Sequence, residues 1–264
     1  MALMHVHYFS DTLGMATQME VVLPQRDDRQ IGLARTEHLE DVPVLYLLHG
    51  MTDNHTTWTR NTNVERYALA KGFAVVMPTA HLSFYADMDM GFDYFTHISE
   101  EIPRVVRSFF PQITTKRERT FIAGNSMGGY GCMLHALRRP DRFAGAMCFS
   151  GAVDILATQA LAPGGEGGPF WTDIFGDMKA FEGGKYDLFH LAEADADGVK
   201  PAVWMWCGFD DGLLPQSRRM RDHLNRLGYA LDYSESEGDH SWTCWERELP
   251  RALDWMADRL KEAK

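Results

Sequence analysis

Short apolar runs without charged residues alternate along this chain with segments whose apolar residues recur at helical spacing. The runs cover Val44–Leu48, 73–77, 120–123, 144–149 and 204–207, and a strand-like segment follows at 231–235. Apolar runs of this length are typical of strands that are buried on both faces of a parallel sheet. Their alternation with helical segments predicts an α/β architecture built on a mostly parallel sheet with helices on both faces.

The helical segments are recognised by apolar periodicity and by residues that end helices. Helices are predicted at 63–71, 100–110 and 130–138, at Met220, Leu224 and Leu227 before Gly228, and along a final face of Leu249, Leu253, Met256 and Leu260. Gly228 has the place of a C-terminal cap, and Pro250 is expected at the start of the last helix or at a kink in it. Residues 15–23 predict an early strand, antiparallel and at the sheet edge.

Residues 152–200 break this alternation because they are rich in glycine and irregular in period, most clearly at 163–169. The segment lies between two predicted core strands. A linker between two domains is the alternative, but the second half of the chain has no separate core. We therefore predict a single domain, 1–264, with a cap insertion at about 152–200 that shapes the pocket of the functional site.

The composition of the chain excludes several classes of binding partner and location. The chain has 264 residues, 45% of them hydrophobic, which is enough for one domain with a substantial core. Its 26 basic and 37 acidic residues give a net charge of −11, so binding to nucleic acid or to anionic membranes is not expected. We also expect no membrane span, because no apolar run approaches about 18 residues. The N-terminal residues lack the features of a secretory signal. The four widely spaced cysteines indicate reduced core thiols, and together these observations predict a cytoplasmic protein.

The strongest chemical signal is the hexapeptide 124–129, Gly-Asn-Ser-Met-Gly-Gly. It fits G-x-S-x-G, the strand-to-helix turn that holds a nucleophilic serine in a strained, exposed position. A strand-like run precedes it and a helix-like run follows. A glycine-rich turn with an unreactive serine at Ser126 is the alternative. Whether Ser126 is a nucleophile therefore depends on whether the chain also supplies a base and an orienting acid.

Partners follow in the order expected for α/β-hydrolases, which is serine, acid, histidine. Asp210 and Asp211 come after the apolar run 204–207, and His240 comes after 231–235. We favour Asp211 as the orienting acid because it opens the turn furthest beyond the strand. Asp210 would then stabilise the turn, and Asp239 is a third, weaker option beside the histidine.

An oxyanion hole needs two backbone N–H groups near the serine. Met127, directly after Ser126, supplies one candidate at the start of a helix. The loop after Val44–Leu48 begins His49-Gly50-Met51, and Met51 is the second candidate. We interpret His49 as a structural residue that fixes this loop, because the predicted base lies much later in the chain.

These motifs, and others spread along the chain, carry a family resemblance. The further matching stretches are 52–55 with Trp58, 62–66, 75–78, 91–94, 109–111, 175–177 and 239–242. The chain resembles the esterase branch of the α/β-hydrolases that contains tributyrin esterases, acetyl and feruloyl esterases and esterase D-type S-formylglutathione hydrolases. It is most similar to the bacterial tributyrin-esterase group.

The resemblance implies the α/β-hydrolase fold and assigns roles to particular residues. By that resemblance, Ser126, Asp211 and His240 take the triad positions, and Met51 and Met127 take the oxyanion positions. Asn125 departs from the family pattern, in which leucine is more usual. The glycine-rich stretch 163–169 is a second departure. Because of it, the roles of the family's cap residues are harder to assign to positions in this chain. The resemblance is compatible with dimers or larger assemblies.

The predicted function is that of a serine carboxylesterase acting on short-chain acyl esters through an acyl-enzyme intermediate. Trp58, Trp171 and Trp242 are the candidate walls of the substrate pocket. Alternatives are feruloyl or acetyl-carbohydrate ester hydrolysis, S-formylglutathione thioester hydrolysis and acyl transfer. A non-catalytic binding protein on the same fold is a further alternative. No cofactor and no metal are expected, because none of the 11 histidines lies in H-E-x-x-H or zinc-like spacing.

Overall fold

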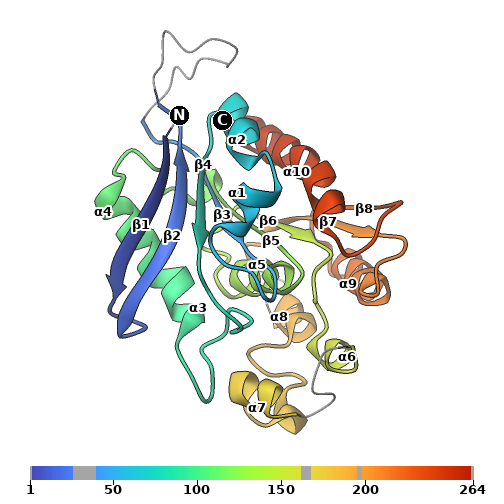
Figure 1. Ribbon diagram of the computed structural model, residues 1–264. Coiled ribbons are helices and arrows are strands. Elements are labelled where there is room, and N and C mark those ends of the chain that lie inside the picture. The colour runs from blue at the N-terminus through green and yellow to red at the C-terminus, as the bar shows by residue number, and fades with distance from the viewer. Residues whose placement is uncertain (1, 26–39, 162–167, 195–197, 263–264) are drawn as a thin grey trace.

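The computed structural model describes residues 2–25, 40–161, 168–194 and 198–262. Eight strands in these ranges form one sheet in the order β1-β2-β4-β3-β5-β6-β7-β8 (Figure 1). The strands are β1 (Ala2–Ser10), β2 (Met15–Leu23), β3 (Val44–Leu48), β4 (Ala74–Pro78), β5 (Thr120–Asn125), β6 (Gly145–Phe149), β7 (Ala202–Gly208) and β8 (Leu231–Ser236). The pairs β1–β2 and β2–β4 are antiparallel, and every other neighbouring pair is parallel. The predicted sheet is therefore confirmed.

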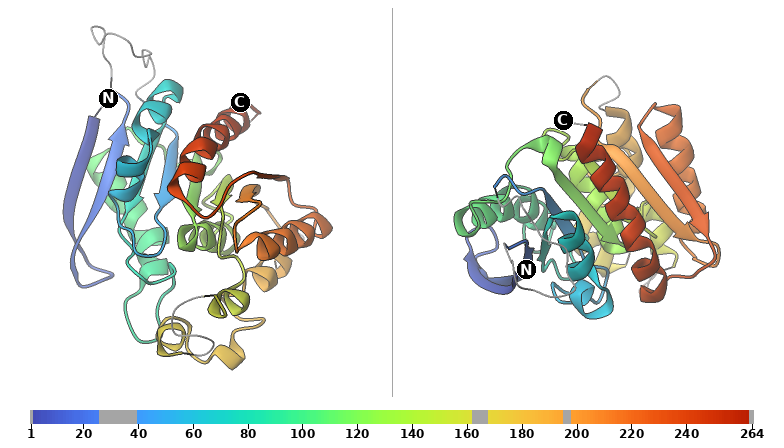
Figure 2. Two further views of the ribbon diagram at one scale, coloured as in Figure 1. Left: turned by 45° about the vertical axis from the view of Figure 1, so that its right-hand side comes forward. Right: turned by 90° about the horizontal axis from the view of Figure 1, so that it is seen from above.

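Helices cover both faces of this sheet. They are α1 (Thr57–Asn61), α2 (Val64–Lys71), α3 (Tyr94–Thr96), α4 (Ile102–Phe109), α5 (Met127–Arg138), α6 (Ile155–Gln159), α7 (Pro169–Phe175), α8 (Leu188–Ala194), α9 (Leu214–Arg226) and α10 (Trp242–Glu262). A π-helical turn, η1 (His97–Glu101), precedes α4, and 3₁₀ turns occur at η2 (Arg117–Arg119) and η3 (Met178–Ala180). Helices α1, α2 and α10 lie on one face, and α4, α5 and α9 lie on the other (Figure 2).

The central strand β3 shows why its sequence is apolar throughout. All five of its residues are buried. Tyr46 and Leu48 belong to the core on the α5 side, whereas Leu45 and Leu47 belong to the core on the α10 side. Because side chains alternate between the two faces of a strand, a strand covered on both faces needs an apolar residue at every position.

The structure corrects several predicted elements. The strand at 15–23 has the predicted bounds, but β1 occupies the edge of the sheet and β2 lies next to it. Helix α5 begins at Met127, three residues before the predicted start, because its glycines belong to the first turn of the helix. Pro250 lies inside α10 and not at its start, because this helix begins at Trp242. The segment 152–200, whose sequence is irregular in period, contains α6, α7 and α8, while its residues 162–167 and 195–197 lie outside the described residues.

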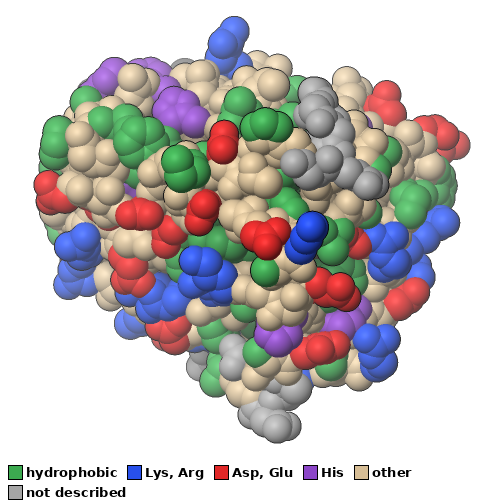
Figure 3. Space-filling model, turned by 90° about the horizontal axis from the view of Figure 1, so that it is seen from below, with side chains coloured by type: hydrophobic (Ala, Val, Ile, Leu, Met, Phe, Trp, Pro, Cys, Tyr) green, Lys and Arg blue, Asp and Glu red, His purple; other side chains and the backbone are tan. Residues whose placement is uncertain are grey.

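The surface at the lower end of the molecule, where α6 and α7 lie, is of mixed character. Acidic, basic and hydrophobic side chains alternate over this face without a dominant charge (Figure 3). All four cysteines are buried and free of disulfides, as predicted. Within the described ranges, no helix is both long and apolar enough to cross a membrane.

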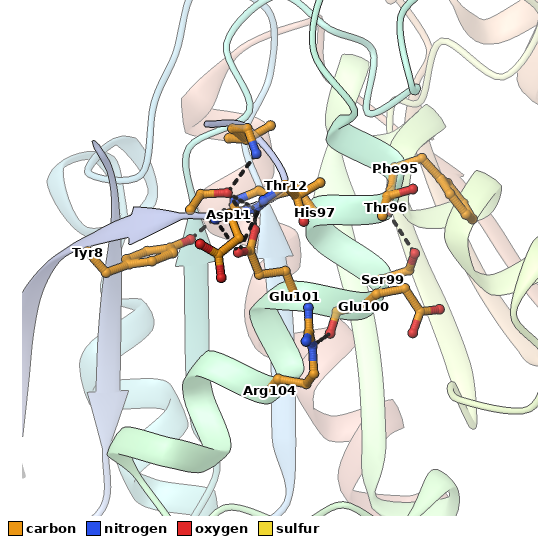
Figure 4. A network of polar contacts seen from close by, with 12 residues as sticks. Tyr8, Asp11, Thr12, Phe95, Thr96, His97, Ser99, Glu100, Glu101 and Arg104 are labelled. Atoms are coloured by element: carbon orange, nitrogen blue, oxygen red, sulfur yellow. Dashed lines mark hydrogen bonds and ion pairs between the residues drawn. The ribbon is translucent and has the colours of Figure 1, made fainter. Parts of the chain in front are cut away.

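A buried polar network fastens the edge strand β1 to the π-helical turn η1 (Figure 4). The Glu101 carboxylate accepts hydrogen bonds from Ser10 Oγ at 2.5 Å, from the Asp11 N–H at 2.7 Å and from His97 Nδ1 at 2.7 Å. The Tyr8 hydroxyl lies 3.1 Å from His97 Nε2. Although burial alone would raise the pKa of Glu101, these hydrogen bonds lower it to about 2. The carboxylate is therefore ionised and paired at neutral pH.

Candidate active site

Ser126 lies at a sharp turn between β5 and α5. Its φ of 54° falls in the left-handed region, which non-glycine residues rarely adopt. The turn is held by the neighbouring strand, because the Ser126 N–H donates to the Phe149 carbonyl at 3.0 Å. A Cβ at Gly124 would lie 2.3 Å from the Gly128 carbonyl oxygen, and one at Gly128 would lie 2.5 Å from the Leu48 carbonyl oxygen. Both positions therefore require glycine, as the motif indicates.

A hydrogen-bonded chain connects Ser126 to the ends of two other strands. Ser126 Oγ lies 2.9 Å from His240 Nε2, and His240 Nδ1 lies 2.9 Å from an Asp211 carboxylate oxygen. Because an ionised carboxylate only accepts hydrogen bonds, the proton of a neutral His240 belongs on Nδ1. Nε2 is then available to receive a proton from the serine hydroxyl.

The environment of Asp211 suits an ionised, fixed carboxylate. Its side chain is 1% exposed, and its second oxygen accepts the Leu213 N–H at 2.9 Å. Burial would raise the pKa of Asp211, but the hydrogen bond and the charge of His240 outweigh burial and lower the pKa below its usual value. The carboxyl therefore stays charged beside the imidazole.

The other two aspartates considered from the sequence point elsewhere. Asp210 is exposed, and its N–H donates to the Gly238 carbonyl at 2.9 Å. The Asp239 carboxylate accepts a hydrogen bond from Ser241 Oγ at 2.5 Å. A Cβ at Gly208 would lie 2.2 Å from the Gly238 carbonyl oxygen. The loop that contains Asp210 and Asp211 therefore packs closely against the loop that contains His240.

His49 fixes the loop after β3, as predicted. Its Nδ1 donates to the Gly50 carbonyl at 2.8 Å, and its Nε2 accepts the Ala80 N–H at 2.9 Å. Its own carbonyl accepts the Tyr85 hydroxyl at 2.8 Å. Burial lowers the pKa of His49 to about 4, so the ring is neutral at neutral pH and keeps this donor–acceptor pattern.

Beneath this loop lies Asn125, the residue that departs from the family pattern. Its side chain is buried, and neither its amide nitrogen nor its amide oxygen has a hydrogen-bond partner among the described residues. A Cβ at Gly50 would lie 3.1 Å from the Asn125 amide nitrogen. The amide therefore packs directly against the loop that follows β3, at the desolvation cost of an unpaired polar group.

A cavity of about 320 Å³ opens above the serine. Met51 and Met127, the predicted oxyanion residues, both line it together with Ser126, Asp211 and His240. The remaining lining residues are Phe84, Ala152, Thr158, Leu161, Gly212 and Leu213. Sequence reasoning missed Phe84, Thr158 and Leu161, because no motif marks these positions. Leu213 could have been predicted from the sequence, because it lies two residues after the predicted acid.

None of the three predicted pocket tryptophans lines this cavity, and we correct that prediction. The Trp58 indole N–H donates to the Leu48 carbonyl at 2.9 Å, and the Trp58 ring packs edge-on against Trp242 at 4.9 Å between ring centroids. Trp171 is fully buried and packs behind the cavity wall against Phe84, with ring centroids 5.1 Å apart. Their large apolar surfaces stabilise the core that supports the cavity.

A serine at the strand-to-helix turn of a mostly parallel, helix-covered sheet defines a serine hydrolase of the α/β-hydrolase class. Residues 10–256 match the sequence profile of the family described as putative esterase. The chain belongs to this family, and it is an enzyme that hydrolyses ester bonds.

Individual relatives agree over nearly the whole chain. An acetyl esterase from Caldicellulosiruptor saccharolyticus is 30% identical, over 97% of this chain and 98% of that protein. The fluorophosphonate-binding serine hydrolase F of Staphylococcus aureus is 32% identical and superimposes with a TM-score of 0.85, over 97% of this chain and 98% of that one. An S-formylglutathione hydrolase from Staphylococcus aureus is 31% identical, with a TM-score of 0.83 and the same coverage of both chains.

Proposed function

We propose that the chain is a serine carboxylesterase that cleaves short-chain acyl esters through an acyl-enzyme on Ser126. His240 is the general base, Asp211 orients it, and the N–H groups of Met51 and Met127 form the oxyanion hole. The observation that carries the proposal is the chain of two 2.9 Å hydrogen bonds from Ser126 through His240 to Asp211. A serine hydroxyl needs such a base to become a nucleophile at neutral pH.

In the first half-reaction, the Ser126 hydroxyl proton moves to His240 Nε2 while Oγ attacks the ester carbonyl carbon. The tetrahedral intermediate places its negative oxygen in the oxyanion hole. The bond to the alcohol then breaks, and His240 Nε2 gives its proton to the departing alkoxide. The acyl group remains as an ester on Ser126. Asp211 keeps its negative charge throughout and stabilises the imidazolium that forms.

In the second half-reaction, water takes the place of the alcohol. His240 Nε2 accepts a proton from the water, whose oxygen attacks the acyl carbon and gives a second tetrahedral intermediate. When the bond to Ser126 Oγ breaks, the serine recovers the proton from His240 and the carboxylic acid leaves. An alcohol in place of this water would give acyl transfer, so water access decides the outcome.

The helix geometry supports the oxyanion assignment. Met127 is the first residue of α5, and the first N–H groups of a helix have no partner within it. They carry the positive end of the helix dipole, which favours a developing negative oxygen. The Met51 N–H belongs to the loop that His49 fixes, so it is held in place before substrate binds.

We also propose that residues 152–200 act as a cap within a single domain. The support is that Ala152, Thr158 and Leu161, from this segment, line the cavity at Ser126. Helices α6 and α7 lie below the sheet, at the end where the parallel strands finish (Figure 1). The cap would thus shape the space for the acyl group and the leaving alcohol.

The decisive experiment follows release of nitrophenol from nitrophenyl acetate on the millisecond scale. An acyl-enzyme whose hydrolysis is slower than its formation gives a burst of about one nitrophenol per active site. Prior treatment with a fluorophosphonate, followed by mass spectrometry, should abolish the burst and label Ser126. Labelling of another residue, or no turnover of any ester, would overturn the proposal. A panel that adds a feruloyl ester, an acetylated sugar and S-formylglutathione assigns the substrate class.

A further inference from the structure

A second cavity, of about 360 Å³, lies at the end of the sheet opposite to Ser126. Thr120, the first residue of β5, lines it, whereas Ser126 follows the last residue of that strand. Six steps along a strand separate the two cavities by roughly 20 Å. The second cavity therefore does not belong to the ester-cleaving site.

This cavity is basic, although the chain as a whole carries a net charge of −11. Of the described residues that line it, four are arginines and one is an aspartate. The arginines are Arg104 and Arg107 on α4, Arg117 in η2, and Arg142 in the loop before β6. The aspartate, Asp141, is already held by Arg139 through two hydrogen bonds of 3.0 and 2.8 Å. Its charge still acts on Arg117 and Arg142, and the charge of Glu118 also acts on Arg117, so the lining arginines are only partly compensated.

Within the described ranges, no carboxylate forms an ion pair with Arg104, Arg107 or Arg117, whereas Arg142 pairs with Glu100. Arg117 is instead oriented by backbone carbonyls. Its Nε donates to Pro140 at 2.6 Å, and one terminal nitrogen donates to Lys200 at 3.4 Å. A half-buried guanidinium that is held by neutral acceptors keeps its full positive charge for a ligand.

The inner wall of the same cavity is apolar. Tyr46 and Phe143 meet edge-on with ring centroids 6.3 Å apart, and Val106 and Ile113 complete this wall. Apolar walls combined with a few convergent charged groups are typical of small-molecule sites, and the volume is within their usual range. An organic ligand could pack its apolar part against this wall, which an inorganic ion cannot do.

We propose that this cavity binds a small organic anion, namely a carboxylate or phosphate group carried on an apolar body. The arginines would contact the anionic group, since the guanidinium fork matches both carboxylate and phosphate oxygens. The apolar body would lie against Tyr46 and Phe143. The site is independent of ester cleavage, so its ligand need not be a substrate or a product.

The test is isothermal titration calorimetry of the whole protein after its nucleophilic serine has been blocked with a fluorophosphonate, which excludes binding at the ester-cleaving site. The probes are benzoate, phenyl phosphate, inorganic phosphate and neutral benzyl alcohol. We expect benzoate or phenyl phosphate to bind with a Kd of about 1 mM or tighter. Binding should weaken as salt is added, because the anionic contacts are partly exposed. The preferred probe distinguishes a carboxylate ligand from a phosphate ligand.

Matched variants locate the site. Arg107→Gln, at an exposed position, should weaken binding of the preferred probe by about tenfold. Arg117→Gln should weaken it at least as much, provided that its melting temperature shows a folded protein. Arg66→Gln, an exposed arginine on α2, should leave binding unchanged. Absence of saturable binding by both organic anions, equal binding of benzyl alcohol or inorganic phosphate, or unchanged binding in Arg107→Gln would each overturn the proposal.

Discussion

At the scale of single residues, the proposed mechanism requires Ser126 and His240 to act as one unit. Replacement of Ser126 by alanine removes the nucleophile and should lower kcat by about 10⁶. His240→Ala should be similarly severe, because it removes the base that lies 2.9 Å from the serine hydroxyl. Steady-state kinetics on a nitrophenyl ester measures both losses.

The double variant is the control for this prediction. If the two side chains serve one step, Ser126→Ala combined with His240→Ala should be little worse than either single change. Losses that multiply would show that the residues act independently. Circular dichroism should confirm that all three variants fold.

The adjacent aspartates offer a sharper residue-scale test. Asp211→Asn keeps the shape of the side chain but destabilises the productive His240 tautomer, so kcat should fall by about 10⁴. Asp210→Asn is the matched control, since Asp210 is exposed and its backbone N–H, which this change keeps, donates to Gly238. We expect it to retain near-normal kcat. The opposite ranking would transfer the orienting role to Asp210.

Residue-scale prediction from the sequence worked where chemistry constrains residue type and order. A serine in a glycine-bounded turn, followed by an acid and a histidine at later strand ends, is a pattern that few structures other than a triad produce. The structure indeed brings Ser126, Asp211 and His240 together. The cavity walls carry no such pattern. Large aromatic residues near the motifs in sequence, such as Trp58, suggest pocket walls, but Trp58 is fully buried in the core.

At the scale of elements, the polar network between β1 and η1 predicts acid sensitivity. Glu101 has a pKa of about 2 in the folded protein, below its ordinary value of 4.5. A lowered carboxyl pKa contributes stability above pH 4.5, and this contribution is lost as the pH falls from 4.5 toward 2. Burial also lowers the pKa of His97, so protonation of the unfolded chain adds to the loss on acidification.

Glu101→Gln tests this contribution by urea unfolding at several pH values. The variant should lose about 2 kcal/mol of unfolding free energy at pH 7, and the difference from the unmodified protein should shrink as the pH falls below 4.5. Glu100→Gln is the matched control, because Glu100 is 39% exposed and pairs with Arg139 and Arg142 at the surface. Its effect should stay below about 1 kcal/mol. A constant difference at all pH values would contradict the account.

The boundaries of helices and strands could be predicted where the local sequence pattern agrees with the burial that the fold imposes. Val44–Leu48 has the predicted bounds because burial on both faces leaves no polar residue inside the strand. The sequence signals failed where packing overrides them. Pro250 suggested either a helix start or a kink, and it lies inside α10, which begins eight residues earlier and whose residues Cys244, Trp245 and Leu249 are buried. The sequence predicts one helix over 100–110, whereas in the structure the π-helical turn His97–Glu101 precedes α4.

At the scale of the whole molecule, two cavities of different character lie at opposite ends of the parallel strands. The one at the carboxyl ends of the strands contains the serine, as expected for an open parallel sheet. The one at the amino ends is lined by arginines. Alternating strands and helices predicted the first location, because every parallel strand ends at the same edge. The second could not be predicted, since its arginines come from separate segments that only the fold brings together.

The cavity at Ser126 also sets the expected substrate size. Met51, Met127, Phe84 and Leu213 surround a volume of about 320 Å³ that the acyl group and the leaving alcohol must share. Each methylene that fits adds roughly 0.8 kcal/mol of binding, whereas one that clashes adds nothing. We therefore expect kcat/KM to peak between acetyl and butyryl esters and to fall steeply by octanoyl.

A widened cavity should shift this preference. Leu161 lines the cavity and is 62% exposed, so Leu161→Ala should leave the fold intact and raise the ratio of octanoyl to butyryl kcat/KM severalfold. Leu156→Ala is the matched control, because Leu156 is 40% exposed on α6 but does not line this cavity. Nitrophenyl esters of increasing chain length measure both ratios. Equal activity of the unmodified enzyme on butyryl and palmitoyl esters would contradict the short-chain prediction, and a marked preference for feruloyl esters would favour an aromatic acyl group instead.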